Sequence, residues 1–334
     1  MVHVRLLAGL WKTQRQTPEA LCGHPAIEPR SGVRGKSSAL PWLNYAVKQT
    51  ILSVMTREEF LKLSAFAALS GTALAQQQPG HSGADLGFTD TPMLPGLPYH
   101  VHDPDRPHPP VVTPASTPGG PPSDAIVLFD GKDLSKWQQK GRGAQAGQMV
   151  DPQWKVGNGY FEVVPHSGEL LTKEKFGDIQ LHVEWSSPTE IRGSSQSRGN
   201  SGILVMSLYE IQVLDAWENP TYADGEAGAI YGQWPPLAFP ARRPGEWNTY
   251  DIVFEAPHFA ADGKLLKPAY QTVFYNGVVV HNRKELMGPM IYRHVAQYRP
   301  HDAEMPLALQ DHNTPVRYRN IWIRRLNGYD GHPL

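Results

Sequence analysis

The chain has 334 residues, enough for two domains by length alone. Its 31 Lys and Arg residues balance 32 Asp and Glu residues, so charge does not favour nucleic acid or an acidic membrane surface as a partner. The 31 glycines, 31 prolines and 9 tryptophans favour a turn-rich, all-β domain over a helical one.

An export signal is predicted at residues 55–75. Positively charged residues precede a short apolar run, Leu63–Leu74, and Ala73-Leu-Ala75 suits a signal peptidase. The run is too short to span a bilayer, so no membrane span is expected. We therefore expect translation to begin at Met55, residues 1–54 to be an upstream extension, and the mature protein to be periplasmic or extracellular. The alternative for 55–75 is a short buried helix.

Residues 76–124 are dense in proline and polar side chains. Proline lacks a backbone donor and restricts the residue before it, so such a run forms neither a helix nor a central strand. This segment is predicted to be an extended tether with polyproline character. The folded domain is expected over 125–326, followed by a short tail at 327–334.

From Ala125 onward the sequence changes to short, alternating apolar runs separated by turn residues. Asn158-Gly159 and Asn276-Gly277 predict tight hairpins, because these residues tolerate the positive φ of a type I′ turn. No run has a helical period. The strands are predicted at 126–129, 154–156, 160–164, 179–185, 203–214, 250–254, 270–275, 278–280, 307–310 and 318–324. Regular short strands with hairpin turns predict an antiparallel β-sandwich or jelly roll.

Three of these strands carry amide, imidazole or carboxylate side chains on the face opposite their apolar residues. Alternation sends residues i and i+2 of a strand to the same face. Trp185 has core parity, which excludes it from the polar face. The polar set is Gln180, His182 and Glu184 from the first strand, Glu210 and Gln212 from the second, and Gln310 and His312 from the third. Solvation of an outer face is the simpler interpretation, but these types together also suit a hydroxyl-rich ligand.

Two loops add candidate residues. Arg198 and Asn200 lie in a polar loop before the Ile203 strand, and Tyr231 and Trp234 lie in a later loop and could stack on a sugar. No phosphate-binding loop, zinc spacing or nucleophile elbow is present. A divalent cation such as calcium could be bound by Asp215 or Asp224 with backbone carbonyls, although the spacing is not that of an EF-hand. No cofactor is otherwise predicted.

Several stretches between Ala125 and Leu326 resemble, in order, a bacterial family described as 3-keto-disaccharide or 3-keto-glycoside hydrolases. The matching stretches are LFDGKDLSKW (128–137), RGNSGILVMSLYEIQVLDAWENP (198–220), GAIYGQWPP (228–236), PGEWNTYDIVF (244–254) and LQDHNTPVRYRNIWIRRL (309–326). The resemblance implies a concanavalin A-like lectin/glucanase fold. Asn313 stands where the family has glycine.

The resemblance also implies a substrate that a separate sugar 3-dehydrogenase has already oxidised at C3. A 3-keto group acidifies the C2 proton, so one base can start an elimination that expels the C1 substituent, with water adding afterwards. Glu184, Glu210 and His312 are the predicted catalytic residues, with His312 or Glu184 as acid or base and Glu210 as the second carboxylate. The predicted substrate-binding residues are His182, Arg198, Asn200, Gln212, Tyr231, Trp234 and Gln310.

Two other functions are compatible with a polar sheet face. A non-catalytic carbohydrate-binding module would use the same face without turnover. A retaining endo-glucanase would need carboxylates at alternate positions of one strand, but the Glu210 strand continues with Gln212 and Leu214. The paired carboxylates of ordinary glycosidases are therefore missing from this strand.

Overall fold

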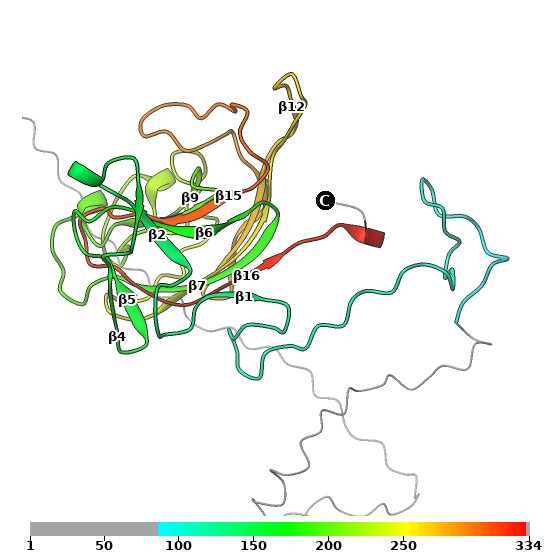
Figure 1. Ribbon diagram of the computed structural model, residues 1–334, viewed down its shortest axis with the longest axis horizontal. Helices are drawn as coiled ribbons and strands as arrows, with labels where there is room; N and C mark the ends of the chain where they lie inside the picture. Colours follow the sequence, from blue (N-terminus) through cyan, green and yellow to red (C-terminus); the bar gives the residue numbers. More distant parts are fainter. Residues whose placement is uncertain (1–85, 332–334) are drawn as a thin grey trace, which may run out of the picture. The chain divides into compact units, whose positions relative to one another are not determined.

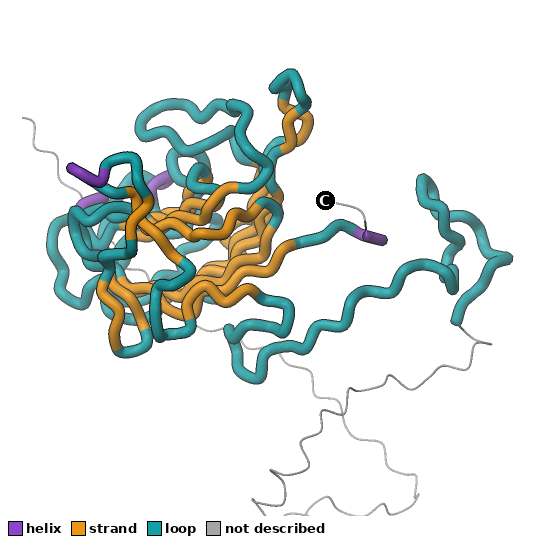
Figure 2. Tube along the Cα trace, viewed as in Figure 1, coloured by secondary structure: helices purple, strands orange, loops and turns teal. Residues whose placement is uncertain are grey.

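A computed structural model of the chain describes residues 86–331 (Figures 1 and 2). The upstream extension and the predicted signal peptide lie outside these residues. The strands are β1 (Ile126–Phe129), β2 (Trp137–Lys140), β3 (Met149–Val150), β4 (Lys155–Gly157), β5 (Tyr160–Glu162), β6 (Leu170–Phe176), β7 (Ile179–Ser186), β8 (Ser201–Val205), β9 (Tyr209–Val213), β10 (Asn248–Glu255), β11 (His258–Phe259), β12 (Leu265–Lys267), β13 (Tyr270–Tyr275), β14 (Val278–Glu285), β15 (Met305–Leu309) and β16 (Arg317–Arg325). Helical structure in the described part is limited to the 3-10 turns η1 (Gly143–Gln145), η2 (Ser195–Ser197), η3 (Ala223–Gly225) and η4 (Tyr329–Gly331). None of these turns could cross a membrane.

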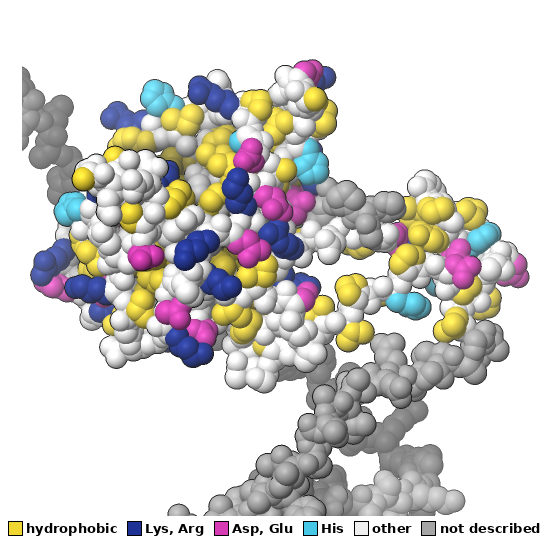
Figure 3. All heavy atoms as spheres, viewed as in Figure 1, with side chains coloured by type: hydrophobic (Ala, Val, Ile, Leu, Met, Phe, Trp, Pro, Cys, Tyr) yellow, Lys and Arg dark blue, Asp and Glu magenta, His cyan; other side chains and the backbone are white. Residues whose placement is uncertain are grey.

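Two antiparallel sheets form the sandwich. The eight-stranded sheet has the order β14-β13-β10-β7-β16-β5-β4, with β1 also paired to β16, and the six-stranded sheet has the order β3-β2-β6-β15-β8-β9. The short strands β11 and β12 form a separate ribbon. The predicted antiparallel β-sandwich is therefore confirmed. On the face shown in Figure 3, basic and acidic side chains are interspersed over the sandwich rather than segregated by sign.

The apolar faces of the two sheets meet in one core. Alternation along β10 is regular, with every second side chain buried, and Trp185 of β7 is 1% exposed, as its parity predicted. Buried tyrosine hydroxyls join the sheets. Tyr250 on β10 donates to the carbonyl of Gln212 on β9 (2.8 Å), and Tyr318 on β16 donates to Ser201 Oγ on β8 (2.7 Å). These bonds satisfy polar atoms that would otherwise destabilise an apolar interior.

Turn chemistry explains both a successful and a failed strand prediction. The two Asn-Gly hairpins are confirmed, with φ of 55° and 78° at Asn158 and Gly159. The single strand predicted over 203–214 is wrong, because the chain reverses between β8 and β9 at Met206 and Ser207, whose φ values are 53° and 57°. Neither residue is typical of a turn with positive φ, so the sequence carries no local signal for this hairpin.

The last part of the tether packs on the outer face of the eight-stranded sheet. The carbonyl of Gly119 accepts hydrogen bonds from Asn320 Nδ2 (2.8 Å) and Trp322 Nε1 (2.9 Å). Asp124 accepts from the Arg324 guanidinium at 2.6 Å. An isolated bridge between Met93 and His100 is the only β pairing within described residues 86–125. The predicted extended tether is thus partly a strap attached to the sheet.

Candidate functional site

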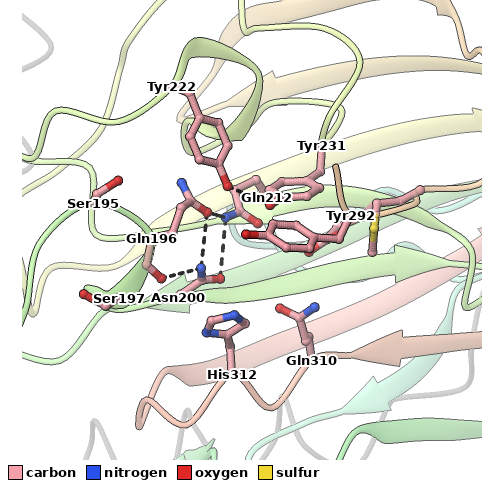
Figure 4. Close-up of a pocket in the computed structure, with 12 residues that line it drawn as sticks. Ser195, Gln196, Ser197, Asn200, Gln212, Tyr222, Tyr231, Tyr292, Gln310 and His312 are labelled. Atoms are coloured by element: carbon pink, nitrogen blue, oxygen red, sulfur yellow. Dashed lines mark hydrogen bonds between the residues drawn. The ribbon is translucent and has the colours of Figure 1, made fainter. Parts of the chain in front are cut away.

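A cavity of about 560 Å³ lies on the outer face of the six-stranded sheet. Figure 4 shows Gln310 and His312 on one side of it, opposite Tyr231 and Tyr222. The side chains that line it are Ser195, Gln196, Ser197, Asn200, Glu210, Gln212, Tyr222, Tyr231, Met290, Tyr292, Gln310 and His312. Six of the predicted site residues are therefore together: Asn200, Glu210, Gln212, Tyr231, Gln310 and His312. We call this space the acid cavity.

Strand parity brings Glu210 and Gln212 to this face. Their neighbours Ile211 and Val213 are fully buried in the core, so the alternate residues of β9 point away from it. Gln212 lies directly opposite Gly202 of β8, in an antiparallel register. The same parity on β15 and its continuation turns Gln310 outward, and in the sheet order β15-β8-β9 only β8 lies between Gln310 and the side chains of β9.

The Glu210 carboxyl group is buried and unpaired. The side chain is 3% exposed, and no described residue forms a hydrogen bond with its carboxylate oxygens. On the same side of the sheet, an apolar cluster of Leu171, Leu204 and Ala308 is covered by Met290, which also lines the cavity. Burial, and secondarily the nearby charge of Glu169, raise the pKa of Glu210 to about 8. A carboxyl group of this kind can exchange a proton near neutral pH.

Gly202 provides the space that the Glu210 side chain occupies. A Cβ atom at this position would stand 2.1 Å from Glu210 Oε1 and 2.9 Å from its Cδ. The φ of Gly202 is not positive, so the backbone itself accepts other residues. The absence of a side chain at Gly202 thus lets the Glu210 carboxyl group lie over this part of β8.

Three amides of the same cavity form the hydrogen-bonded wall shown in Figure 4. Gln212 Nε2 donates to Gln196 Oε1 (2.9 Å), and Asn200 Nδ2 donates to the Gln196 carbonyl (2.7 Å). Gln212 Oε1 is buried and has no hydrogen-bond partner among the described residues. This wall suits a ligand with several hydroxyl groups.

Gln196 was missed by the sequence reasoning, although it organises the cavity. Its Nε2 donates to Thr221 Oγ1 and to the carbonyl of Gly225, both at 2.8 Å. These bonds hold the following loop, in which the hydroxyls of Tyr222 and Tyr231 are 2.7 Å apart. Tyr292 and Met290 were missed too, because they belong to a loop without any periodic pattern. Only the polar composition of the 194–202 loop could have pointed to Gln196.

Arg198, predicted as a substrate ligand, faces away from the acid cavity. Its Nε donates to Asp215 Oδ2 (2.7 Å) and its Nη2 to the carbonyl of Trp217 (2.8 Å). Both members of the ion pair are nearly inaccessible to solvent. The guanidinium thus connects two loops and lies on a different cavity, of about 540 Å³, with Asp215.

His182 and Glu184 are also separated from the acid cavity, so the prediction of one shared polar face is wrong. Their strand, β7, belongs to the eight-stranded sheet, whereas β9 and β15 belong to the six-stranded sheet. The outer faces of a sandwich point in opposite directions, and parity within a strand cannot tell which sheet the strand joins. Glu184 Oε2 accepts from Arg319 Nε at 2.6 Å, and the acidic residue is therefore paired on that outer face.

The imidazole of His182 lies on the outer face of the eight-stranded sheet, next to Trp322, which binds the strap. It is 2% exposed, lies parallel to the Trp322 ring at 5.2 Å, and its Nδ1 is 2.7 Å from Asp251 Oδ1. Burial alone would lower the pKa of His182, but hydrogen bonds to Asp251 and Glu184 outweigh it and raise the pKa to about 9. The pKa of Glu184 falls to about 2: burial opposes this, but His182, Asn320 and Arg319 hold the carboxylate charged.

These shifts predict a pH-dependent contribution to stability. Because the pKa of His182 rises from 6.5 to about 9, its stabilisation is complete below pH 6.5 and is lost as pH rises through about 9. The difference in unfolding free energy between wild type and His182→Gln should therefore shrink steadily over this range. Urea denaturation at several pH values measures it, and a difference that does not change with pH would contradict the charged state of His182.

Trp234, predicted to stack on a sugar, is occupied by contacts with the protein. Lys284 Nζ lies 3.3 Å from the centre of its ring, and Trp234 Nε1 donates to the carbonyl of Glu285 (3.1 Å). Its side chain does not line the acid cavity. Tyr231 does, and the aromatic contribution of this loop comes from that residue and Tyr222.

No three His, Cys, Asp or Glu side chains of residues 86–331 gather into a group that could hold a metal ion. Of the two predicted calcium ligands, Asp215 pairs with Arg198, and Asp224 lies in η3 at the edge of a neighbouring cavity. The arrangement of these two carboxylates gives no further support to a calcium site, which stays a prediction.

The chain matches a known protein family over most of its described residues. Residues 124–324 match the family described as the 3-keto-alpha-glucoside-1,2-lyase-like domain. The chain belongs to this family. The match begins just before β1 and ends within β16, so it covers both sheets and every strand that bears a side chain of the acid cavity.

One solved structure shows the same fold. A protein from Parabacteroides distasonis ATCC 8503, provisionally named a glycosyl hydrolase, is 45% identical, with a TM-score of 0.62, over 70% of this chain and 100% of that chain. A second protein of that organism with the same provisional name is 18% identical, with a TM-score of 0.45, over 61% of this chain and 94% of the other. A search of curated proteins found no match.

Proposed function

We propose that the protein cleaves the glycosidic bond of 3-keto-glycosides, including 3-keto-disaccharides, by elimination followed by hydration. The observation that carries this proposal is the unpaired Glu210 carboxyl group, buried in a cavity of about 560 Å³ beside a wall of amides. Membership of the 3-keto-alpha-glucoside-1,2-lyase-like family supports the same chemistry. The protein would act on a sugar that a separate dehydrogenase has oxidised at C3.

The reaction needs a base for the C2 proton, donors for the developing enolate and an acid for the leaving oxygen. The base takes the proton from C2, and the electron pair of that bond forms an enolate with the C3 carbonyl. When the enolate collapses, C1 and C2 become doubly bonded and the C1 substituent leaves as an alcohol, taking up a proton. Water then adds at C1 and a proton returns to C2, which completes a net hydrolysis.

In this proposal Glu210 is the base at C2. Its raised pKa makes the carboxylate a stronger base than an exposed one, and it has no competing partner in the cavity. Gln212, Asn200 and Gln310 bind the sugar hydroxyls and the developing enolate. His312, which is exposed at the cavity wall, supplies the proton to the leaving oxygen. Tyr231 provides an aromatic surface for the ring.

The pH dependence of the reaction tests the role of Glu210. A base must be ionised, so the rising limb of the kcat/KM profile for a 3-keto-glycoside should follow the ionisation of Glu210, with its raised pKa of about 8. The rate profile of wild-type protein between about pH 5 and pH 9 measures this. A rate that instead falls as pH passes through about 8 would make Glu210 the proton donor.

A direct assay separates this function from a non-catalytic carbohydrate-binding module. Purified protein is incubated with a 3-keto-disaccharide and with the parent disaccharide, with and without chelator, and released monosaccharide is measured. Release from the oxidised sugar alone is expected. Release from the parent sugar alone, or from neither, would reject the proposal, and saturable binding without release would favour the binding module. Loss of release with chelator would favour the predicted calcium requirement.

Export completes the proposed role. The segment with the predicted signal, 55–75, lies outside the described residues. A periplasmic or extracellular location therefore remains part of the proposal. It would place the protein where oxidised glycosides of external origin are available.

A further inference from the structure

A second cavity, of about 520 Å³, adjoins the acid cavity and differs from it in chemistry. Three side chains, those of Tyr222, Tyr231 and Tyr292, line both spaces. The acid cavity is otherwise dominated by amides and hydroxyls, whereas the second cavity continues with Met287, Ile291 and Val295. We call it the aromatic cavity.

The apolar side chains of the aromatic cavity are unusually open to solvent. Tyr222 is 45% exposed, Ile291 is 40%, Met287 is 41%, Tyr292 is 64% and Val295 is 75%. Grouped exposed apolar side chains of this kind are typical of binding surfaces, while single ones are normal. Apart from the three tyrosines, the titratable groups that line this cavity are Asp224, Arg293 and His294.

The wall is held in place rather than being a free loop. Gln233 connects the two segments that form it: its Nε2 donates to the carbonyl of Gly288 (2.9 Å), and its Oε1 accepts from the backbone N–H of Met287 (2.7 Å). Further along the same loop, the backbone N–H of Met290 donates to the carbonyl of Leu208 (2.9 Å). The side chain of Met290 covers the apolar cluster next to Glu210. The apolar surface is therefore built onto the acid cavity.

From this continuity we infer that the aromatic cavity binds the leaving group of the substrate, and that this group is apolar or aromatic. The inference rests on the proposed function. A substrate held with its oxidised sugar among the amides has to direct its C1 substituent out of the acid cavity. The polar cavity of Arg198 and Asp215 is the other neighbour, but it shares only Ser197 with the acid cavity.

Benzyl and methyl glucosides test the inference, because their leaving alcohols have closely similar acidity and differ mainly in apolar size. The 3-keto derivatives of benzyl glucoside and methyl glucoside are compared as both anomers. For the wild type, kcat/KM should be about tenfold or more higher for the benzyl glucoside than for the methyl glucoside, which is the size of effect an apolar pocket gives.

The variant Ile291→Ser/Val295→Ser should reduce the benzyl-to-methyl ratio to near one. Leu266→Ser is the matched control, because Leu266 is a 65% exposed apolar residue of β12 that lines none of these cavities. It should keep the wild-type ratio. A benzyl preference that survives the double variant, or a wild type without a benzyl preference, would overturn the inference. Cleavage of no 3-keto-glucoside at all would reject the proposed function, and this inference with it.

Discussion

Glu210→Gln should lower kcat for a 3-keto-glycoside by about 10²–10⁴-fold, the range expected when a positioned general base is removed. Glutamine keeps the shape of the side chain but cannot take the C2 proton. The fold should survive, because the carboxyl group has no hydrogen-bonded partner to lose. Steady-state kinetics with circular dichroism and thermal unfolding on the same preparation measure both effects.

Glu184→Gln is the matched control for this experiment. Glu184 is a glutamate on a polar strand face that sequence parity made equivalent to Glu210, but it lies on the other sheet and pairs with Arg319. Its variant should keep wild-type turnover. A large loss of turnover at Glu184 with normal turnover at Glu210→Gln would reverse the assignment of the site.

Gly202→Ala offers a second route to the same conclusion without changing the acid itself. The new methyl group would lie only 2.1 Å from the present position of Glu210 Oε1. The carboxyl group, at the end of a flexible side chain, would therefore have to move aside. Turnover should fall steeply while the protein stays folded. Unchanged turnover would show that the position of Glu210 over Gly202 does not matter for the reaction.

Arg198→Met should be the most destabilising substitution among the predicted site residues. It leaves Asp215, 3% exposed, as an unpaired buried carboxylate and removes the bonds to the neighbouring loop. Breaking a buried ion pair by removing one partner typically costs about 3–5 kcal/mol in unfolding free energy. Urea or thermal denaturation measures the loss.

Arg192→Met is the control, since the exposed pair of Arg192 with Glu190 should contribute nothing measurable. If Arg198→Met instead kept full stability and weakened only substrate binding, the substrate-contacting role predicted from the sequence would be right and the structural role wrong.

Local patterns in the sequence predicted most of the strands and the direction of their side chains, but they did not predict β2, β3, β6, β11 or β12. Alternation on β9 and β15 correctly turned Glu210, Gln212 and Gln310 away from the core, because the two-residue period of a strand is a property of the backbone alone. Asn158-Gly159 correctly predicted a hairpin for the same reason: its conformation depends on the residues of the turn themselves.

The sequence alone did not place the strands in sheets. Both β7 and β9 have a polar outer face, yet they belong to opposite sheets. Glu210 therefore lines the acid cavity, whereas Glu184 and His182 contact Asn320 and Trp322, the two residues that bind the strap. The hairpin at Met206 was missed because its positive φ values are imposed by the surrounding sheet rather than by the residue types.

By itself, the sequence determined an antiparallel β-sandwich, the family to which it belongs, and six of the side chains that line the acid cavity. Tertiary structure decided which polar face is the site, because sheet membership depends on long-range pairing that no local period records. It also decided the chemistry of Glu210. The sequence shows a glutamate on a polar face, but its raised pKa comes from burial beside Leu204 and Met290, which separate parts of the chain bring together.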